Sequence, residues 1–331
     1  MVRTLGLAGG LGCGVTQKGF LMEDKSLADV QEENPAFPWA PPATVGMIGG
    51  FGEMGRLFSR LFEDLGYTVI VSDPRRGEVS NEELVQRSDI VVFAVPLHQT
   101  VSIIGSLAPL VRENQLLMDF TSLKVLPVKE MLHTRASVVG LHPMFGGRVP
   151  SFEGQTLVAC PVRIESEWWQ ALRAMFESRG LRVKETSPED HDRLMSIIQV
   201  LFHMTTMLTG RVLRELGVSI SETLEYTSPS YRLEISLLGR IFAQNSALYS
   251  AITQMNPHTG EIIDQLRKGL DLYRGWFEEG RLDAFMEDFQ KSAEHLGDFC
   301  SEAYRESSEI LNFSVNLARE RREEESTDSQ E

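Results

Sequence analysis

Short apolar runs alternate with longer mixed segments between Thr44 and about Thr186. The runs are TVGMI, TVIVS, DIVVFAV, LLMDF, SVVGL and QTLVAC, and each has the length of a buried strand. Helical patterns lie between them, and Ser80 with Glu83 forms a capping box at the start of one helix. This alternation predicts a parallel sheet with helices on both faces.

Strand signals stop after Thr186, and helical patterns continue toward the C-terminus. Ser187, Pro188 and Asp190 form a helix start, and the segment HDRLMSIIQVLFHMTTMLTGRVLREL then predicts one long helix. This helix is apolar nearly all round, which indicates burial between other helices or between subunits. We therefore expect an α/β domain followed by an all-α dimerisation domain, and a homodimer.

The two ends of the chain differ from the segments between them. Residues 1–43 are rich in glycine, then acidic, and end in PAFPWAPP, which predicts a flexible leader. GLAGGLGCG within it has no strand before it and no amphipathic helix after it, so we do not interpret it as a nucleotide loop. The expected organisation is a leader (1–43), a dinucleotide-binding domain (44–187), a helical substrate and dimerisation domain (188–318) and a disordered tail (319–331).

Composition excludes several classes of function. A net charge of -15 over 331 residues disfavours binding to nucleic acids and to anionic membranes. No apolar run approaches the roughly 20 residues of a membrane span. The three cysteines are far apart, without the spacing of a metal site, as in a reduced protein. We expect a soluble cytoplasmic protein that holds no metal and acts on a small molecule.

The segment VGMIGGFGEMGRLF places a glycine motif between a strand and a helix. Gly50, Gly52 and Gly55 have the G-x-G-x-x-G spacing of a dinucleotide-binding loop, which identifies a Rossmann-like domain. The first glycine permits a tight turn, the second lets a pyrophosphate approach the backbone, and the third lets helix and strand pack. The N–H groups at the helix start would bind the anion. The predicted cofactor contacts in this loop are Gly50, Phe51, Gly52, Glu53, Met54 and Gly55.

An acidic residue ends the next strand, TVIVS. Asp73 lies at about the distance from the glycines where a carboxylate binds the ribose hydroxyls of NAD. Arg75 and Arg76 follow and could receive the 2'-phosphate of NADP. The sequence therefore favours NAD as the cofactor and leaves NADP open.

Polar residues follow several apolar runs, where ligands bind in an open α/β sheet. AVPLHQT carries Pro96 and His98, DFTSLK carries Ser122 and Lys124, and GLHPMFGG carries His142. A histidine held by a following proline at a strand end, near a nicotinamide, is placed to take a proton as hydride leaves. His142 is the strongest candidate for a catalytic base, and His98 is a weaker one.

The helical half contains two pairs of polar residues in apolar surroundings. Gln199 and His203 are four apart and share a helix face, where they either bind a substrate or bond to backbone and water. Arg232 and Arg240 are eight apart on one face of another apolar helix. They indicate a carboxylate clamp, with a structural ion pair as the alternative for each.

Five segments together resemble the prephenate dehydrogenase family. They are VGMIGGFGEMGRLF, VVFAVPLHQT, VVGLHPMFGG, EDHDRLMSIIQ and SPSYRLEISLLGRIFAQN, and the resemblance covers about Val45 to Leu311. The glycine motif is generic, whereas HPMFG, SP-x-YRLE and GR-x-FAQ are specific to the family. The resemblance implies NAD-dependent oxidative decarboxylation of prephenate to 4-hydroxyphenylpyruvate, a step of tyrosine biosynthesis, on a homodimer with interlocked helical domains.

The resemblance also implies roles for particular residues. The catalytic histidine of the family falls on His142, and a serine that orients the substrate hydroxyl falls on Ser122. The substrate-carboxylate arginine falls on Arg232, and a polar contact from the helical domain falls on His203. We expect Gln199 and Lys124 to contact substrate as well, and Pro96 to contact the cofactor.

Several alternatives stay open at this point. The leader is too short for the chorismate mutase helices of the enteric bifunctional relatives, so we expect no mutase activity. Arg148 follows HPMFGG where the enteric enzyme has a proline and an acid, which could change the preferred substrate. Arogenate and 4-amino-4-deoxyprephenate are alternative substrates. A 3-hydroxyacid or 6-phosphogluconate-type dehydrogenase is a second alternative, but we do not find its glycine-rich substrate loop and helix-borne lysine in this sequence. A third alternative is a catalytically silent NAD-sensing dimer, which would need neither His142 nor Arg232.

Overall fold

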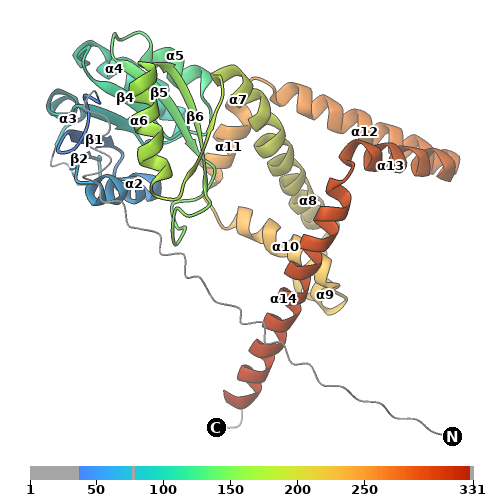
Figure 1. Ribbon diagram of the computed structural model, residues 1–331. Helices are drawn as coiled ribbons and strands as arrows, with labels where there is room; N and C mark the ends of the chain where they lie inside the picture. The colour runs from blue at the N-terminus through green and yellow to red at the C-terminus, as the bar shows by residue number, and fades with distance from the viewer. Residues whose placement is uncertain (1–36, 77–78, 329–331) are drawn as a thin grey trace, which may run out of the picture.

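The computed structural model describes residues 37–76 and 79–328 of the chain (Figure 1). A seven-stranded sheet with the order β2-β1-β3-β4-β5-β6-β7 forms the first part. The six apolar runs of the sequence supply its first six strands. The bounds are β1 Thr44–Ile48, β2 Thr68–Ser72, β3 Ile90–Phe93, β4 Leu116–Asp119, β5 Ser137–Pro143, β6 Thr156–Arg163 and β7 Arg182–Glu185.

Helices cover both faces of this sheet, as predicted. Buried side chains of α2 (Glu53–Asp64) and α6 (Ser166–Glu177) pack on one face in a single apolar cluster. Side chains of α3 (Asn81–Arg87), α4 (Leu97–Leu107) and α5 (Val125–Met131) pack on the other. A 3-10 turn, η1 (Ala108–Leu110), follows α4. The Ser80 hydroxyl accepts the Glu83 N–H at 3.1 Å, which confirms that helix start.

The sheet is parallel except at one place. β5 pairs with β6 in the antiparallel sense, whereas every other pair is parallel. The connection between these two strands has no helix, and a parallel crossover usually needs one. The prediction of a parallel sheet is therefore correct for every neighbouring pair of strands except β5 and β6. The antiparallel pair places the loop 144–155 beside the carboxyl end of β5.

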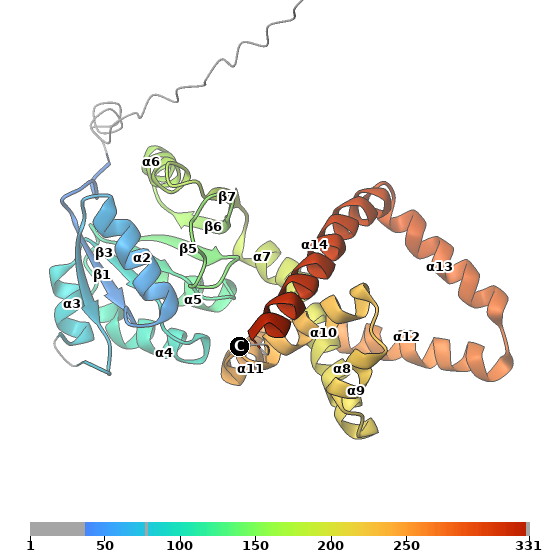
Figure 2. The same cartoon turned by 90° about the horizontal axis from the view of Figure 1, so that it is seen from below.

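The second part is entirely helical within the residues that the structure describes. The predicted long helix runs from Pro188 to Leu216, but it contains a π-helical segment between two α-helical ones. Further helices extend away from the sheet, and α12 and α13 reach farthest (Figures 1 and 2). The bounds are α7 Pro188–Met195, η2 Ser196–Leu201, α8 Phe202–Leu216, α9 Ile220–Glu225, α10 Pro229–Phe242, α11 Ser246–Met255, α12 Thr259–Glu279, α13 Leu282–Leu296 and α14 Phe299–Asp328. None of the helices described is long and apolar enough to cross a membrane.

Both predicted ends differ from the structure where it describes them. Trp39, in the expected leader, is only 2% exposed, and its ring meets Trp168 edge-on at 5.2 Å. Its Nε1 donates a hydrogen bond to the Asn114 carbonyl at 2.9 Å. Residues 37–43 are therefore part of the packed domain, because burying two aromatic rings outweighs the local preference for an open Pro segment. The GLAGGLGCG segment lies outside the described residues.

The expected disordered tail is also helical over most of its length. α14 continues to Asp328, past the predicted domain end at residue 318. The segment LARERREEE consists of strong helix formers of both charges, which favour continuation of a helix that has already started. The prediction of disorder from residue 319 gave too much weight to charge.

Candidate active site

The glycine loop has the close packing that a dinucleotide loop requires. Gly49, which follows β1, has a φ of +83° and makes the tight turn, a role that the sequence had suggested for Gly50. A Cβ on Gly50 would lie 2.5 Å from the Val71 side chain. A Cβ on Gly55 would lie 2.6 Å from the Gly50 Cα, so only glycine lets α2 pack this close to β1.

The start of α2 is open to a ligand. Gly52 is the N-cap of this helix, and no side chain caps it. Gly52 and the first two residues of α2, Glu53 and Met54, line a cleft of about 510 Å³. Uncapped N–H groups at a helix start bind anions, so the loop fits the pyrophosphate of a dinucleotide. Phe51 lies beside the loop with the Arg76 guanidinium 4.4 Å from the centre of its ring.

Asp73 lines the same cleft and is tied to the glycine loop. Its carboxylate accepts hydrogen bonds from the Phe51 N–H at 3.3 Å and from the Arg75 N–H and Nε at 3.0 Å each. Arg75 thus folds back on Asp73, and Arg76 stacks on Phe51. Pro96 lines the other side of the cleft. The arrangement fits a ribose diol near Asp73, with both arginines engaged by the protein.

His142 is at the carboxyl end of β5 and lines the floor of this cleft. The imidazole is only 3% exposed. Its Nδ1 is 2.9 Å from His191 Nε2, and its Nε2 is 3.3 Å from the Gln199 side-chain amide. Burial lowers the pKa of His142 well below its ordinary value, and electrostatic repulsion of a protonated ring by the neighbouring His191 and Lys124 lowers it further. The ring is therefore neutral at pH 7 and able to accept a proton.

Two residues of the helical part, Gln199 and His203, each have a buried polar atom without a partner in the described part of the chain, and Gln199 is next to His142. Gln199 is in the π-helical segment η2, and π-helical turns frequently occur at functional sites. Gln199 Oε1 and His203 Nδ1 are buried and have no hydrogen-bond partner among the described residues. The His203 ring meets the Tyr249 ring edge-on at 4.7 Å, and burial lowers the His203 pKa. Buried polar atoms without partners are costly, so these two are suited to bind a substrate.

The residues after β4 divide into one that lines the cleft and one that does not. Ser122 is half-buried and lines the cleft with His142. Lys124 is fully buried, and its ammonium donates to Asp119 at 2.5 Å and to the Leu141 carbonyl at 2.7 Å. The expectation that Lys124 contacts substrate does not fit this structure, because its ammonium is enclosed in an ion pair below the cleft.

A second cavity of about 710 Å³ adjoins the cleft, and the two share Glu53, Pro96 and Gln244. Arg240 lines this cavity, as do His98 and Arg148. The Arg148 guanidinium pairs with Glu53 at 2.7 Å, whereas no described carboxylate is within ion-pair distance of Arg240. Burial raises the pKa of Tyr249, and the nearby Arg240 charge opposes that rise. Arg240 is therefore placed to bind an anionic ligand beside Tyr249.

Arg232, eight residues earlier on α10, is not brought to the site within this chain. Its side chain is exposed and lines neither the cleft nor the second cavity. The sequence analysis interpreted Arg232 and Arg240 as a carboxylate clamp, but in the structure the two arginines do not line a common cavity. Of the two arginines, Arg240 lines the second cavity and Arg232 does not.

The sequence analysis did not single out three residues near the candidate site residues. His191 contacts His142, Asp192 contacts His191, and Tyr249 contacts His203. His191 and Asp192 belong to the quoted segment EDHDRLMSIIQ, so a signal for them was present. Among the described residues, no group of His, Cys, Asp and Glu could hold a metal ion.

Comparisons with known proteins find matches for both parts of the chain. The model of the prephenate dehydrogenase nucleotide-binding domain matches residues 71–185, and the model of the prephenate dehydrogenase dimerization domain matches residues 187–291. The T-protein of Haemophilus influenzae is 33% identical over 82% of this chain and 72% of its own length. The chain belongs to the prephenate dehydrogenase family.

One further relative by sequence and two solved structures are also similar to this chain. The probable arogenate/prephenate dehydrogenase of Methanocaldococcus jannaschii is 35% identical over 79% of this chain and 62% of its own length. Prephenate dehydrogenase from A. aeolicus, solved with hydroxyphenyl propionate and NAD+, has a TM-score of 0.61 at 17% identity and covers 81% of this chain and 98% of its own. Synechocystis arogenate dehydrogenase has a TM-score of 0.59 at 16% identity, over 76% of this chain and 98% of its own. These structures confirm the expected fold, an α/β domain followed by a helical domain.

Proposed function

We propose that this protein oxidises prephenate with NAD and releases carbon dioxide to give 4-hydroxyphenylpyruvate. One observation supports this most: a buried, neutral histidine, His142, lines the same cleft as the glycine loop that fits a dinucleotide. The Methanocaldococcus jannaschii relative is named a probable arogenate/prephenate dehydrogenase, and oxidation of a ring hydroxyl beside a nicotinamide needs such a base.

The cofactor would bind along the cleft from α2 to His142. The uncapped start of α2 would hold the pyrophosphate, and Asp73 would accept hydrogen bonds from the adenosine ribose. A bound nicotinamide supplies the hydride acceptor of the reaction. NADP is less well suited, because Arg75 is already engaged by Asp73 and the Asp73 carboxylate would repel a 2'-phosphate.

His142 would take the proton of the ring 4-hydroxyl as the hydride leaves the same carbon. The lone pair of Nε2 faces Gln199, so this nitrogen is the one that accepts the proton. Carbon dioxide then leaves, its bonding electrons complete the aromatic ring, and the proton returns to the phenolate oxygen. Ser122 lines the cleft beside His142 and would orient the hydroxyl. His203 would offer its unpartnered Nδ1 to the substrate.

Arg240 would bind a carboxylate of the substrate in the adjoining cavity. The cavity is lined by two arginines, Arg240 and Arg148, and by one carboxylate, Glu53. Prephenate carries two carboxylates and no amine, so it suits a cavity with this balance of charge. Arogenate carries an added ammonium, and the presence of Glu53 favours it as the second candidate.

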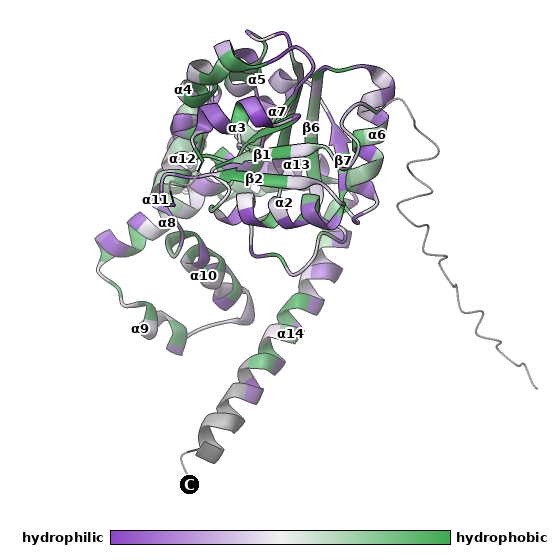
Figure 3. Cartoon of the chain, turned by 90° about the vertical axis from the view of Figure 1, so that its left-hand side faces the viewer, coloured by the Kyte–Doolittle hydropathy of each residue, from purple (hydrophilic) through white to green (hydrophobic). Residues whose placement is uncertain are grey.

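We infer a homodimer formed through the helical part. The matched family model is that of a dimerization domain, and this part exposes many large apolar side chains. Figure 3 shows apolar residues interspersed with polar ones along α10 and α14. Exposed apolar faces of this extent mark interfaces. Examples are Phe202 at 65%, Leu270 at 65%, Phe277 at 71%, Phe289 at 69% and Phe313 at 68% exposure.

A substrate panel tests the proposed activity. Purified protein is mixed with prephenate, arogenate or 4-amino-4-deoxyprephenate, each with NAD and with NADP, and reduction of the nicotinamide is followed by absorbance. We expect the highest kcat/KM with prephenate and NAD. A higher kcat/KM with arogenate would show that Glu53 rather than the arginines sets the preference, and no reduction with any pair would refute the dehydrogenase proposal.

A further inference from the structure

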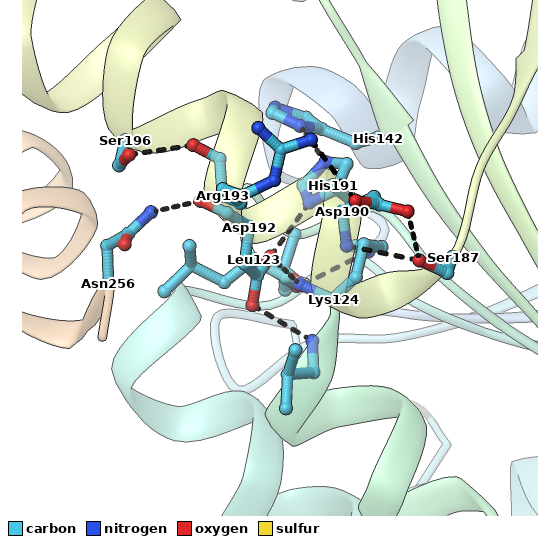
Figure 4. A network of polar contacts seen from close by, with 12 residues as sticks. Leu123, Lys124, His142, Ser187, Asp190, His191, Asp192, Arg193, Ser196 and Asn256 are labelled. Atoms are coloured by element: carbon cyan, nitrogen blue, oxygen red, sulfur yellow. Dashed lines mark hydrogen bonds and ion pairs between the residues drawn. The ribbon is translucent and has the colours of Figure 1, made fainter. Parts of the chain in front are cut away.

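A buried chain of three side chains runs from His142 away from the cleft (Figure 4). His142 Nδ1 is 2.9 Å from His191 Nε2, and His191 Nδ1 is 2.7 Å from Asp192 Oδ1. The exposed fractions are 3% for His142, 0% for His191 and 2% for Asp192. Such a chain, enclosed away from water, fixes which nitrogen of each ring carries a proton.

The hydrogen bonds of Asp192, the last of the three side chains, determine which nitrogen of each histidine carries a proton. The Asp192 carboxylate also accepts the backbone N–H of Lys124 at 2.7 Å and of Val125 at 3.0 Å, so both of its oxygens act as acceptors. His191 must therefore donate from Nδ1 and, being neutral, accept at Nε2. His142 then donates from Nδ1 to His191. The lone pair of His142 is left on Nε2, on the side of Gln199 and the cleft.

The other ionised groups near His142 and His191 are of opposite charge and pair with one another. Burial lowers the pKa of His191, while the hydrogen bond to Asp192 opposes that change. The remaining ionised groups that face the two rings are the Lys124 ammonium and the Asp119 carboxylate, and they pair with one another. Asp192 is thus the one carboxylate hydrogen-bonded to the histidine chain among the described residues.

We propose that His191 and Asp192 are positioning residues that hold His142 as the Nδ1–H tautomer and stabilise its imidazolium after it takes the substrate proton. This inference rests on the proposed dehydrogenase function. When His142 Nε2 receives a proton, its Nδ1–H becomes a stronger donor to His191, whose own Nδ1–H strengthens its bond to Asp192. No proton leaves the chain, and the new positive charge lies two hydrogen bonds from a carboxylate.

Two substitutions of His191 distinguish a role in positioning His142 from a role in folding. His191→Leu removes the acceptor of the His142 Nδ1–H, whereas His191→Gln keeps an amide oxygen that can accept it. We expect His191→Leu to lower kcat about 100-fold to 10,000-fold with a small change in KM, and to shift the acid limb of the pH profile downward. His191→Gln should recover at least about tenfold of that loss. His133→Leu, on a histidine whose side chain is 61% exposed, is the matched control and should behave as wild type.

Nitrogen-15 spectra of labelled histidine supply a readout that does not need turnover. We expect His142 in the wild-type protein to show a protonated Nδ1 and an unprotonated Nε2, and His191→Leu to lose this preference. A wild-type His142 with the proton on Nε2 would overturn the proposal. So would equal losses of kcat in both His191 variants with an unshifted acid limb, because that pattern reports only a smaller folded fraction. An inactive wild type that shows the expected tautomer would refute the dehydrogenase function alone.

Discussion

Replacing Arg240 should weaken substrate binding much more than replacing Arg232. Arg240 lines the cavity of about 710 Å³ next to the cleft, and no described carboxylate pairs with its guanidinium. A hydrogen bond to a charged group is worth about 1.5–3 kcal/mol, and each 1.4 kcal/mol is a factor of ten. Arg240→Ala should therefore raise KM for prephenate roughly 10- to 150-fold, with a smaller change in kcat.

Arg232→Ala is the matched control, since it removes the same group from the same helix. Arg232 is exposed and lines neither cavity, so its loss should change KM less than about fivefold. The assay is initial-rate kinetics with saturating NAD, and NAD affinity is measured separately by fluorescence. A large rise in KM for Arg232→Ala with little change for Arg240→Ala would refute the assignment and restore the role that the family resemblance implied.

Three further predictions concern the base, the cofactor and the packed N-terminal segment. Burial lowers the His142 pKa, so the acid limb of kcat/KM should lie below pH ~6.5, the ordinary value for histidine; a limb above this value would contradict the buried geometry. Asp73→Ser should narrow the preference for NAD over NADP, since it removes a carboxylate near the ribose; an unchanged ratio in rates with the two cofactors would count against this role. Trp39→Ala should lower the free energy of unfolding by about 3–5 kcal/mol in urea titrations, whereas a cost under ~1 kcal/mol would mean that residues 37–43 are not part of the core.

The sheet and its cofactor loop were predictable because they depend on local patterns. Strand length, alternation with helices and the spacing of Gly50, Gly52 and Gly55 are all properties of short segments. The tight turn is at Gly49 rather than Gly50, since two adjacent glycines leave the register of the turn undetermined. The antiparallel direction of β6 was missed because strand direction depends on the connection rather than on the strand's own residues.

The site was predictable for residues at strand ends and less so for residues on helices. His142 and Ser122 line the cleft because they follow strands whose carboxyl ends meet there. Lys124 follows a strand too, but its long side chain turns inward to Asp119, and sequence does not show that direction. Arg240 and Arg232 could not be separated from sequence, because only packing decides which turn of α10 faces the cavity.

Single-turnover oxidation of prephenate by the wild-type protein and by His142→Asn tests the central claim most directly. Reduced nicotinamide, carbon dioxide and 4-hydroxyphenylpyruvate are measured in the same samples, and NAD binding is measured for both proteins. We predict equal amounts of the three products from the wild type, and a loss of about 100-fold or more in the rate for His142→Asn with NAD binding retained. Wild-type turnover that survives intact in His142→Asn would contradict the account.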